Sequence, residues 1–379
     1  MAKKIVFLNT GHYSLDERVF YHQAKSLVSF DYEILIISTK EIRIDFIDSI
    51  HIKSYNDEML SNKENIAKIV AALNEFLPEI IVCDTPTAVI AASVFREKSN
   101  SKIIYDITEW YPSKKNFRNE HGIKKYIKFI ILVLFNIFAG LKSTSFIFGE
   151  YYKSLPFRLL FFWKSYIFLP YYPDLKYIQQ IPFKSIEKEI NLLYSGIINT
   201  DKGIDAVFNA VDLVSRKKPA VLINLQIIGF FPTYEDQQHF KKLCNSLAPN
   251  VRIIRQDKLA YQDFCDAIGK ADLFLDLRKK DIENTLCLPI KLFYYLACGR
   301  PVIYSDLRSI KHEIQNFNFG YLCKPNDCNT IATHIVHYIE NPDIYLQHAT
   351  NALEVSKKVY NWKIIEKKFI LFIEKHRTL

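Results

Sequence analysis

The sequence predicts an α/β protein built from two doubly wound domains, each organised around a largely parallel sheet. Three observations predict this fold class. The chain has 379 residues, 49% of them hydrophobic and 24% charged, so it is globular and long enough for two cores. Short apolar runs alternate with amphipathic helical patterns, as expected for parallel sheets. The alternation stops in a segment with three prolines, residues 169–190, and then begins again.

We therefore expect an N-terminal domain of residues 1–175 and a C-terminal domain of residues 185–362. The first is predicted to contain strands at residues 4–9, 32–38, 79–84 and 102–108, with helices at residues 14–27, 62–77 and 87–98. The second is predicted to contain strands at residues 191–196, 221–229, 251–256, 271–277 and 302–304. Ligands of such sheets bind at the carboxyl ends of the strands, so the loops there are the candidate site regions.

Residues 281–306 form the most informative of these regions. Pro289 suits the first turn of a helix, Gly299 suits the residue just after its end, and Pro301 prevents its continuation. The N-terminal end of this helix, with its free N–H groups and positive dipole end, would point at a polar loop. This arrangement is typical of a site for an anionic group.

The same stretch resembles a known family. Its run L-P-I-K-L-F-Y-Y-L-A-C-G-R-P-V-I is similar to the P-x-K-L-x-E-Y-x-A-x-G-x-P-V-I segment that binds the nucleotide sugar in glycosyltransferase family four, a family of the GT-B type. The two glutamates usual in that family would fall on Leu286 and Tyr294. Because the second glutamate normally binds the ribose, Tyr294 is expected to face the ribose instead, or Glu283 to bind it if Tyr294 points into the core.

Further motifs resemble the same family in the same order. Gly11, His12, Asp16 and Arg18 match G-H-x-x-x-D-x-R-V-F, and residues 105–112 match Y-D-x-H-E-x-Y-P with Thr108 in place of the histidine. Gly196, Lys202 and Gly203 match Y-x-G-x-x-x-x-x-K-G, with Ile197 in place of a frequent arginine.

The resemblance implies a GT-B fold, in which two Rossmann-like domains face a central cleft and the last helix, residues 363–379, returns to the first domain. It implies transfer of a sugar from a nucleotide diphosphate to an acceptor hydroxyl, with retention of anomeric configuration. The N-terminal domain would bind the acceptor and the C-terminal domain the donor. The donor site would contain Gly11, Gly196, Lys202, Gly203, Glu283, Asn284, Lys291 and Tyr294.

The catalytic candidates are His12, Asp106 and Glu109. The two carboxylates lie at the end of a buried strand, where they are often functional in this architecture. Other interpretations remain: Asp106 could cap a turn, Glu109 could pair with a lysine, and His12 could be a turn residue. No metal is expected, because the sequence has no Asp-x-Asp and no zinc-like Cys/His spacing, and no cofactor other than the donor substrate is expected. Seven cysteines without a C-x-x-C pair indicate reduced thiols in the cytoplasm.

The charge of the chain is uneven. The net charge is +9, and residues 112–165 alone carry +8, interleaved with the apolar runs 129–141 and 155–168. Basic residues beside aromatic and aliphatic ones are typical of an interfacial membrane anchor, whereas a buried core helix with a basic edge is the alternative. Nucleic acid is not expected, because the neighbouring residues are long aliphatic runs rather than isolated aromatic platforms. We therefore expect a protein peripheral to the inner face of the cell membrane, with a lipid-linked glycan acceptor of surface polysaccharide assembly.

Two rival functions stay open. A GT-B sugar-nucleotide epimerase shares the fold and would change its substrate without an acceptor. A non-catalytic partner in a glycan-assembly complex would explain the missing glutamates and histidine, and would not bind a nucleotide sugar.

Overall fold

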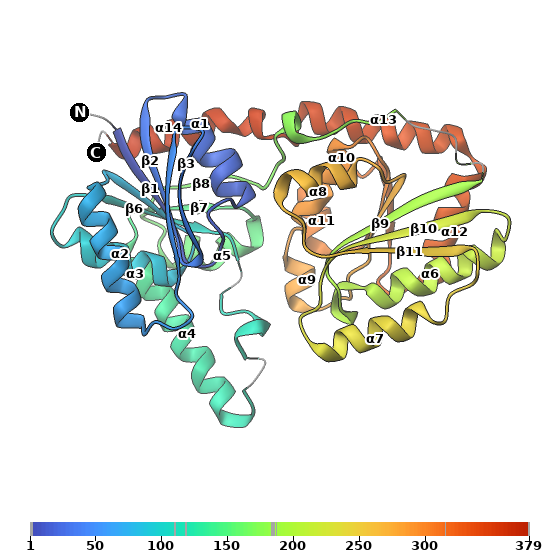
Figure 1. The fold of residues 1–379 in the computed structure, drawn as a ribbon, viewed down its shortest axis with the longest axis horizontal. Coiled ribbons are helices and arrows are strands. Elements are labelled where there is room, and N and C mark those ends of the chain that lie inside the picture. Colours follow the sequence, from blue (N-terminus) through green and yellow to red (C-terminus); the bar gives the residue numbers. More distant parts are fainter. Residues whose placement is uncertain are drawn as a thin grey trace. The chain divides into compact units, whose positions relative to one another are not determined.

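The structure is a computed structural model that describes residues 3–109, 111–117, 120–182, 186, 188–314 and 316–377. The chain divides into two compact units (Figure 1). Unit 1 comprises residues 1–171 together with residues 365–379, and unit 2 comprises residues 172–364.

Unit 1 contains an eight-stranded sheet in the order β3-β4-β2-β1-β5-β6-β7-β8. Its strands are β1 (Lys3–Asn9), β2 (Tyr32–Ser38), β3 (Lys40–Ile47), β4 (Ile50–Asn56), β5 (Ile80–Cys83), β6 (Lys102–Ile107), β7 (Ser145–Phe148) and β8 (Tyr166–Phe168). Its helices are η1 (Glu17–Ala24), α1 (Lys25–Val28), α2 (Asn62–Phe76), α3 (Pro86–Arg96), η2 (Lys114–Phe117), α4 (Gly122–Lys142), α5 (Tyr151–Leu160) and most of α14 (Trp362–Arg377).

Seven of these strands run parallel, and only β3 is antiparallel to its neighbour β4. The sequence did not predict the β3–β4 hairpin, since β3 buries none of its side chains and lacks a core-facing pattern. It also did not predict β7, a run of only four residues between two apolar helices. Helices α2, α3, α4 and α5 cover one face of the sheet, where their apolar residues form a core with β1, β2, β5, β6 and β7.

Unit 2 contains a six-stranded sheet in the order β11-β10-β9-β12-β13-β14, parallel throughout. Its strands are β9 (Glu189–Ile197), β10 (Leu222–Phe230), β11 (Val251–Gln256), β12 (Leu273–Asp276), β13 (Val302–Ser305) and β14 (Gly320–Cys323). Its helices are η3 (Leu175–Tyr177), η4 (Thr200–Lys202), α6 (Ile204–Lys217), α7 (Tyr234–Cys244), α8 (Tyr261–Ile268), α9 (Ile282–Leu286), α10 (Ile290–Ala297), α11 (Arg308–Glu313), α12 (Cys328–Glu340) and α13 (Pro342–Lys358).

The predicted helix after Pro289 is α10, and Pro289 is its N-cap residue. Gly299 follows the helix with a φ of 66°, in the left-handed conformation that suits the residue after a helix end. The helix therefore begins and ends where its sequence signals place it. The apolar side chains of α6 and α12 form a buried core with β9, β10 and β12 on one face of the sheet.

Candidate functional site

In unit 1, the loop after β1 is held by one carboxylate. Asp84, directly after β5, accepts hydrogen bonds from the backbone N–H of Thr10 (2.9 Å) and of Gly11 (3.0 Å), while its Oδ2 lies 2.8 Å from Nδ1 of His12. A Cβ on Gly11 would lie 3.0 Å from Cγ2 of Thr85 and 3.3 Å from Asp84 Oδ2, so a larger residue would require these side chains to move by a few tenths of an ångström. Asp84 thus fixes both the backbone of the loop and the imidazole of His12.

The carboxylate also sets the charge of His12. Burial alone would lower the pKa of His12, but the hydrogen bond to Asp84 and the charges of Asp16, Asp84 and Glu109 together raise this pKa to about 9. The imidazole is therefore protonated at neutral pH, with Nδ1–H donated to Asp84 and Nε2–H available as a charged donor. A group in this state can bind an anion or a hydroxyl oxygen, but it cannot serve as a general base.

Asp106 is buried in an ion pair. Its surroundings favour a structural role rather than the predicted catalytic role. Its side chain is 3% exposed and accepts hydrogen bonds from Arg18 Nε (2.8 Å), Arg18 Nη2 (2.9 Å) and Gln23 Nε2 (2.8 Å). Arg18 Nη1 in turn donates to the carbonyl of Leu169 at 2.8 Å. This buried cluster joins η1 to β6 and gives each oxygen of Asp106 a hydrogen-bond donor inside the core of unit 1.

The loop after β6 places Glu109 differently. Glu109 is exposed, and its negative charge contributes to the raised pKa of His12, so these two catalytic candidates lie in one electrostatic environment. The neighbouring Thr108 carbonyl accepts a hydrogen bond from Lys153 Nζ at 2.8 Å, and Lys153 is paired with Glu150 at 2.6 Å in a buried contact. The sequence analysis did not single out Lys153 or Glu150.

In unit 2, four predicted donor-site residues gather where β9 ends. Lys202 donates from Nζ to Asn284 Oδ1 at 2.6 Å. Lys291, in the first turn of α10, brings its Nζ to 3.1 Å from the position that a Cβ on Gly196 would take. Burial, and then the charge of Arg278, lowers the pKa of Lys202. These contacts form two pairs, Lys202 with the buried amide of Asn284 and Lys291 with the backbone of Gly196.

Gly203 is required by packing. Its φ is 87°, and a Cβ there would lie 1.8 Å from the carbonyl oxygen of Leu277. The turn that contains Lys202 is therefore pressed against the segment after β12, which carries Asn284. This contact explains why distant parts of the sequence meet at one edge of the sheet.

Tyr294 is in the core and does not face the donor loops. Its side chain is 1% exposed, its hydroxyl lies 3.4 Å from that of Tyr261, and its ring packs edge-on against Tyr261. The expectation that Tyr294 faces the ribose is thus at odds with its burial. Glu283, on the short helix α9 and partly exposed, stays the predicted ribose ligand.

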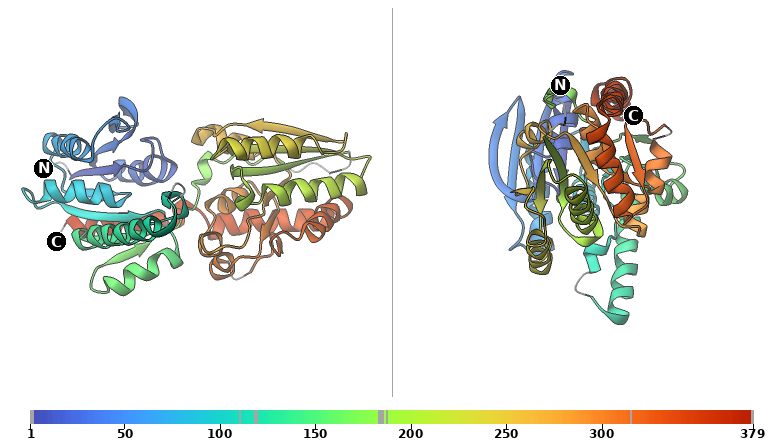
Figure 2. Two further views of the ribbon diagram at one scale, coloured as in Figure 1. Left: turned by 90° about the horizontal axis from the view of Figure 1, so that it is seen from below. Right: turned by 90° about the vertical axis from the view of Figure 1, so that its right-hand side faces the viewer.

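Helix α4 exposes an apolar stripe. It projects beyond the sheet of unit 1 at the end where it begins (Figures 1 and 2). At about 100° per residue, six of its exposed large side chains fall within about 80° of one another around the helix. These residues, hereafter the α4 stripe, are Ile123, Ile127, Ile130, Leu134, Phe138 and Leu141. The face away from the stripe holds the residues that the helix buries, Asn136, Ala139 and Gly140.

The basic residues of this region differ in their accessibility. Lys124 and Lys125 are exposed, and Lys128 pairs with Glu120 at 2.9 Å. Lys164 donates instead to the carbonyls of Gly140 (2.7 Å) and Leu141 (2.8 Å), and so caps the end of α4. The predicted +8 surface is therefore smaller than its sequence count, because Lys153 and Lys164 are used internally; Arg118 lies outside the described residues.

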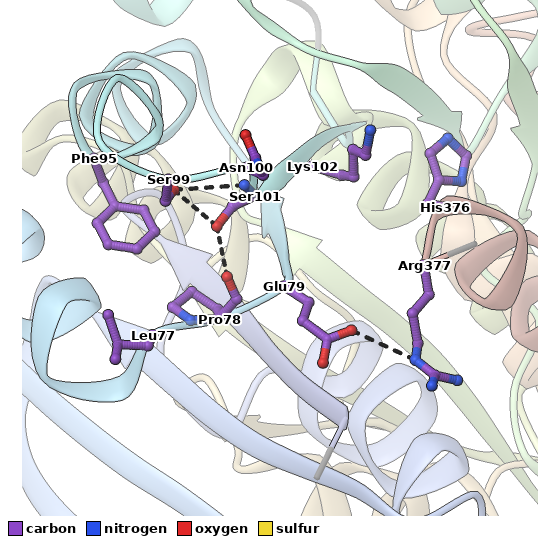
Figure 3. A pocket seen from close by; sticks show the side chains of 10 residues that line it. All are labelled: Leu77, Pro78, Glu79, Phe95, Ser99, Asn100, Ser101, Lys102, His376 and Arg377. Carbon is purple, nitrogen blue, oxygen red and sulfur yellow. Dashed lines mark hydrogen bonds and ion pairs between the residues drawn. The ribbon is translucent and has the colours of Figure 1, made fainter. Parts of the chain in front are cut away.

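Unit 1 also has a cavity of about 460 Å³ away from these loops (Figure 3). It lies between residues 77–79, 99–102 and 376–377, beside the amino ends of β5 and β6. Its walls contain the Glu79–Arg377 ion pair and the Ser99–Ser101 hydrogen bond. None of the predicted site residues lines it.

Two further features are absent from the part of the chain that is described. No helix there has both the length and the apolar character needed to span a membrane. No group of three His, Cys, Asp or Glu side chains there could hold a metal ion.

The two sheets, parallel except for the edge strand β3 and with polar residues at the carboxyl ends of their strands, define a GT-B fold. Residues 189–341 match the family model of the glycosyl transferases group 1. The predicted fold class and family resemblance are thereby confirmed. No curated protein sequence matches the chain.

Solved structures agree with the fold along almost the whole chain. Sucrose-phosphate synthase from Thermosynechococcus elongatus is similar with a TM-score of 0.75 and 13% identity, covering 98% of both chains. A glycosyltransferase from Rickettsia africae has a TM-score of 0.71 and 15% identity, covering 99% of this chain and 98% of its own. Anabaena HepE in complex with UDP-glucose has a TM-score of 0.70 and 13% identity, covering 98% of this chain and 99% of its own. At these identities the likeness concerns the fold.

Proposed function

We propose that this protein is a glycosyltransferase that moves a sugar from a nucleotide-diphosphate donor to a hydroxyl of a lipid-linked glycan acceptor at the inner face of the cell membrane. The observation that carries the proposal is a pair of lysines, Lys202 held by Asn284 and Lys291 beside Gly196. Both lie inside the segment that matches the group 1 glycosyl transferases.

The donor assignment rests on charge. As the glycosidic bond breaks, negative charge gathers on the leaving diphosphate, and fixed cations stabilise it. Lys202 and Lys291 supply such cations, and the first turn of α10 adds the positive end of a helix dipole. In our proposal these groups act without a metal ion. The similarity to HepE, whose structure holds UDP-glucose, favours a uridine nucleotide.

We further propose retention of anomeric configuration. In a retaining transfer, the acceptor attacks from the face that the diphosphate leaves, and the departing phosphate can accept the acceptor proton. Such a reaction needs no strong protein base, and a protonated His12 fits it because the imidazolium can donate a hydrogen bond to the donor. An inverting transfer would need a base, which His12 cannot be while it is charged.

The acceptor assignment rests on the α4 stripe. Helix α4 begins after the carboxyl end of β6, so its projecting end stands on the side of the sheet where Glu109 and His12 lie. Lys124, Lys125 and Lys128 lie in the same first two turns. Each lysine near an anionic membrane contributes about 1 kcal/mol, and the apolar side chains add the free energy of burial in the interface. A lipid-linked acceptor held in that membrane would reach unit 1 near this edge.

The test is a reaction with the full chain, a panel of nucleotide sugars and a polyprenyl-linked saccharide acceptor. We expect stabilisation by one nucleotide sugar in thermal unfolding, release of the nucleoside diphosphate only with the acceptor present, and an α-linkage from an α-linked donor by NMR. Conversion of the donor without an acceptor would favour the epimerase. The absence of binding by any nucleotide sugar would favour a non-catalytic partner.

A further inference from the structure

The segment after β12 carries a buried arginine that the sequence analysis did not consider. This segment packs on the turn that contains Lys202: the N–H of Lys279 donates to the carbonyl of Asp201 at 3.1 Å, and Asn284 Nδ2 donates to the same carbonyl at 3.0 Å. The backbone of Gly203 also lies against this segment, since a Cβ there would be 1.8 Å from the carbonyl oxygen of Leu277 and 3.1 Å from the backbone N of Arg278. Arg278 is therefore fixed beside Lys202 by the backbone of both segments.

The side chain of Arg278 is orientated by one carboxylate. Its Nε donates to Asp276 Oδ1 at 2.8 Å and its Nη2 to Asp276 Oδ2 at 3.1 Å, and the side chain is 14% exposed. This bidentate contact uses one edge of the guanidinium and holds it in a fixed plane. Among the described residues, Nη1 makes no hydrogen bond, so its two N–H donors and the second N–H of Nη2 are unused.

Lys202 and Arg278 thus lie close together in a largely buried region, where few hydrogen-bond acceptors are available to them. Lys202 Nζ has three N–H donors and one acceptor among the described residues, Asn284 Oδ1. The charge of Arg278 is, after burial, the largest influence that lowers the pKa of Lys202, so the two cations repel each other. Asp281 is close, but its two oxygens already accept from the N–H and Nδ2 of Asn284. An anion with several oxygens would relieve the repulsion and accept the unused donors.

We propose that Arg278 is a second cationic ligand of the donor's diphosphate, acting together with Lys202, while Asp276 is the positioning residue that presents its free edge. The inference rests on the proposed function, since it names a residue of the same donor site. Asp276 keeps the guanidinium in place before the ligand arrives, so little side-chain freedom is lost on binding. Arginine suits the task because its planar fork can donate two parallel hydrogen bonds to phosphate oxygens.

The experiment measures binding of inorganic pyrophosphate to the full chain by calorimetry. The test variant is Arg278→Gln with Asp276→Asn, which removes both charges of the buried pair and so avoids an unpaired carboxylate. The matched control is Arg216→Gln with Asp212→Asn, a paired arginine and aspartate on the same unit whose arginine side chain is 71% exposed. We expect about a 10- to 100-fold weaker affinity in the test variant, the range of a charge-assisted hydrogen bond, and no change in the control.

The other outcomes separate the inference from the proposed function. Wild-type affinity in the folded test variant, with a loss in Lys202→Ala, overturns the role of Arg278 and leaves the donor site in place. If the test variant and Lys202→Ala both bind pyrophosphate with the affinity of the unchanged protein, or if the unchanged protein does not bind it, the proposed donor site is overturned and the inference with it. If the double variant does not fold, Arg278→Lys gives the answer: it keeps the charge but loses the fork, and an affinity equal to that of the unchanged protein would overturn the bidentate role.

Discussion

Replacing Asp84 by asparagine should change the titration of His12. Asp84 accepts three hydrogen bonds from the loop of Thr10, Gly11 and His12, and its negative charge supports the protonated imidazole. In Asp84→Asn the carboxamide keeps the size of the side chain but removes that charge. Burial, which lowers the pKa of His12, would then outweigh the remaining influence of Asp16 and Glu109.

The magnitude follows from the pKa of His12. The difference between its ordinary value of 6.5 and about 9 corresponds to roughly 3 kcal/mol, at 1.36 kcal/mol per unit. Because the folded state has the higher pKa, it binds the proton more tightly than the unfolded state. This stabilisation is fully present below pH 6.5 and is lost as the pH rises through about 9. Asp84→Asn should therefore lower the free energy of unfolding by up to about 3 kcal/mol at pH 6, and by much less at pH 9.5.

The assay is a pH titration of the histidine ring signals by NMR, with the His12 signal identified by its loss in His12→Gln. The pKa of His12 should fall from about 9 to 6.5 or lower in Asp84→Asn. Urea unfolding at pH 6 and pH 9.5 measures the stability difference. Asp205→Asn, which removes the partner of His239 in unit 2, is the control and should leave the His12 titration unchanged. A His12 pKa that stays near 9 in Asp84→Asn would show that Asp84 does not cause the raised pKa, and would refute this reasoning.

Three further predictions follow from other contacts. Lys202→Ala should weaken nucleotide-sugar binding by about 1.5–3 kcal/mol, measured by calorimetry, because a charge-assisted contact to the diphosphate is lost. The protein should co-sediment with anionic liposomes at low salt and less at high salt, and Ile127→Asp with Ile130→Asp on the α4 stripe should abolish sedimentation. Stability should fall as the pH drops below 6.5, measured by urea unfolding at pH 5 and 7, because burial lowers the folded-state pKa of His334 and His348 and the unfolded state then takes up more protons.

Each of these three predictions has a control variant or an outcome that would contradict it. Lys217→Ala, an exposed lysine at the end of α6, should not change donor affinity; equal affinities in both lysine variants would show that Lys202 does not bind the donor. Ile42→Asp, at an 85% exposed position on β3, should sediment like the unchanged protein. If the unchanged protein stays in the supernatant at every salt concentration, α4 does not bind membranes. Replacement of His334 and His348 by glutamine should flatten the acid limb, and an unchanged limb would assign it to other groups.

The fold could be predicted because both sheets are built from apolar runs with strong boundaries. Strands such as β2 are buried along almost their whole length, and Pro289 and Gly299 delimit α10 by backbone chemistry alone. The hairpin of β3 and β4 could not be predicted in this way. Its outer strand lies at the edge of the sheet with no buried side chain, so neither apolar periodicity nor a core-facing pattern marked it.

The candidate site was predictable only at the level of loops. Position at or just after the end of a strand drew attention to Gly11, His12 and Asp106, but partners remote in sequence decide what each side chain can do. Arg18 and Gln23 take up Asp106, whereas Asp84 holds His12. Asp84 had a signal that could be read from the sequence, since it directly follows the buried strand β5, and Asp106 likewise lies at the end of a buried strand, β6. Arg278 had none, because its proximity to Lys202 depends on how two segments pack against each other.

The buried cluster of Arg18, Gln23 and Asp106 affects how mutational data on this protein should be interpreted. Removing one member of a buried ion pair typically costs about 3–5 kcal/mol, a large part of the stability of an ordinary domain. An alanine scan that records only product formation would then find Asp106 as essential as a reacting group, since most molecules would have lost the fold of unit 1. Expression level and soluble yield would separate the two cases: Asp106→Ala should deplete the protein itself, whereas a change at Glu109 should leave its amount intact and alter only the turnover of each molecule.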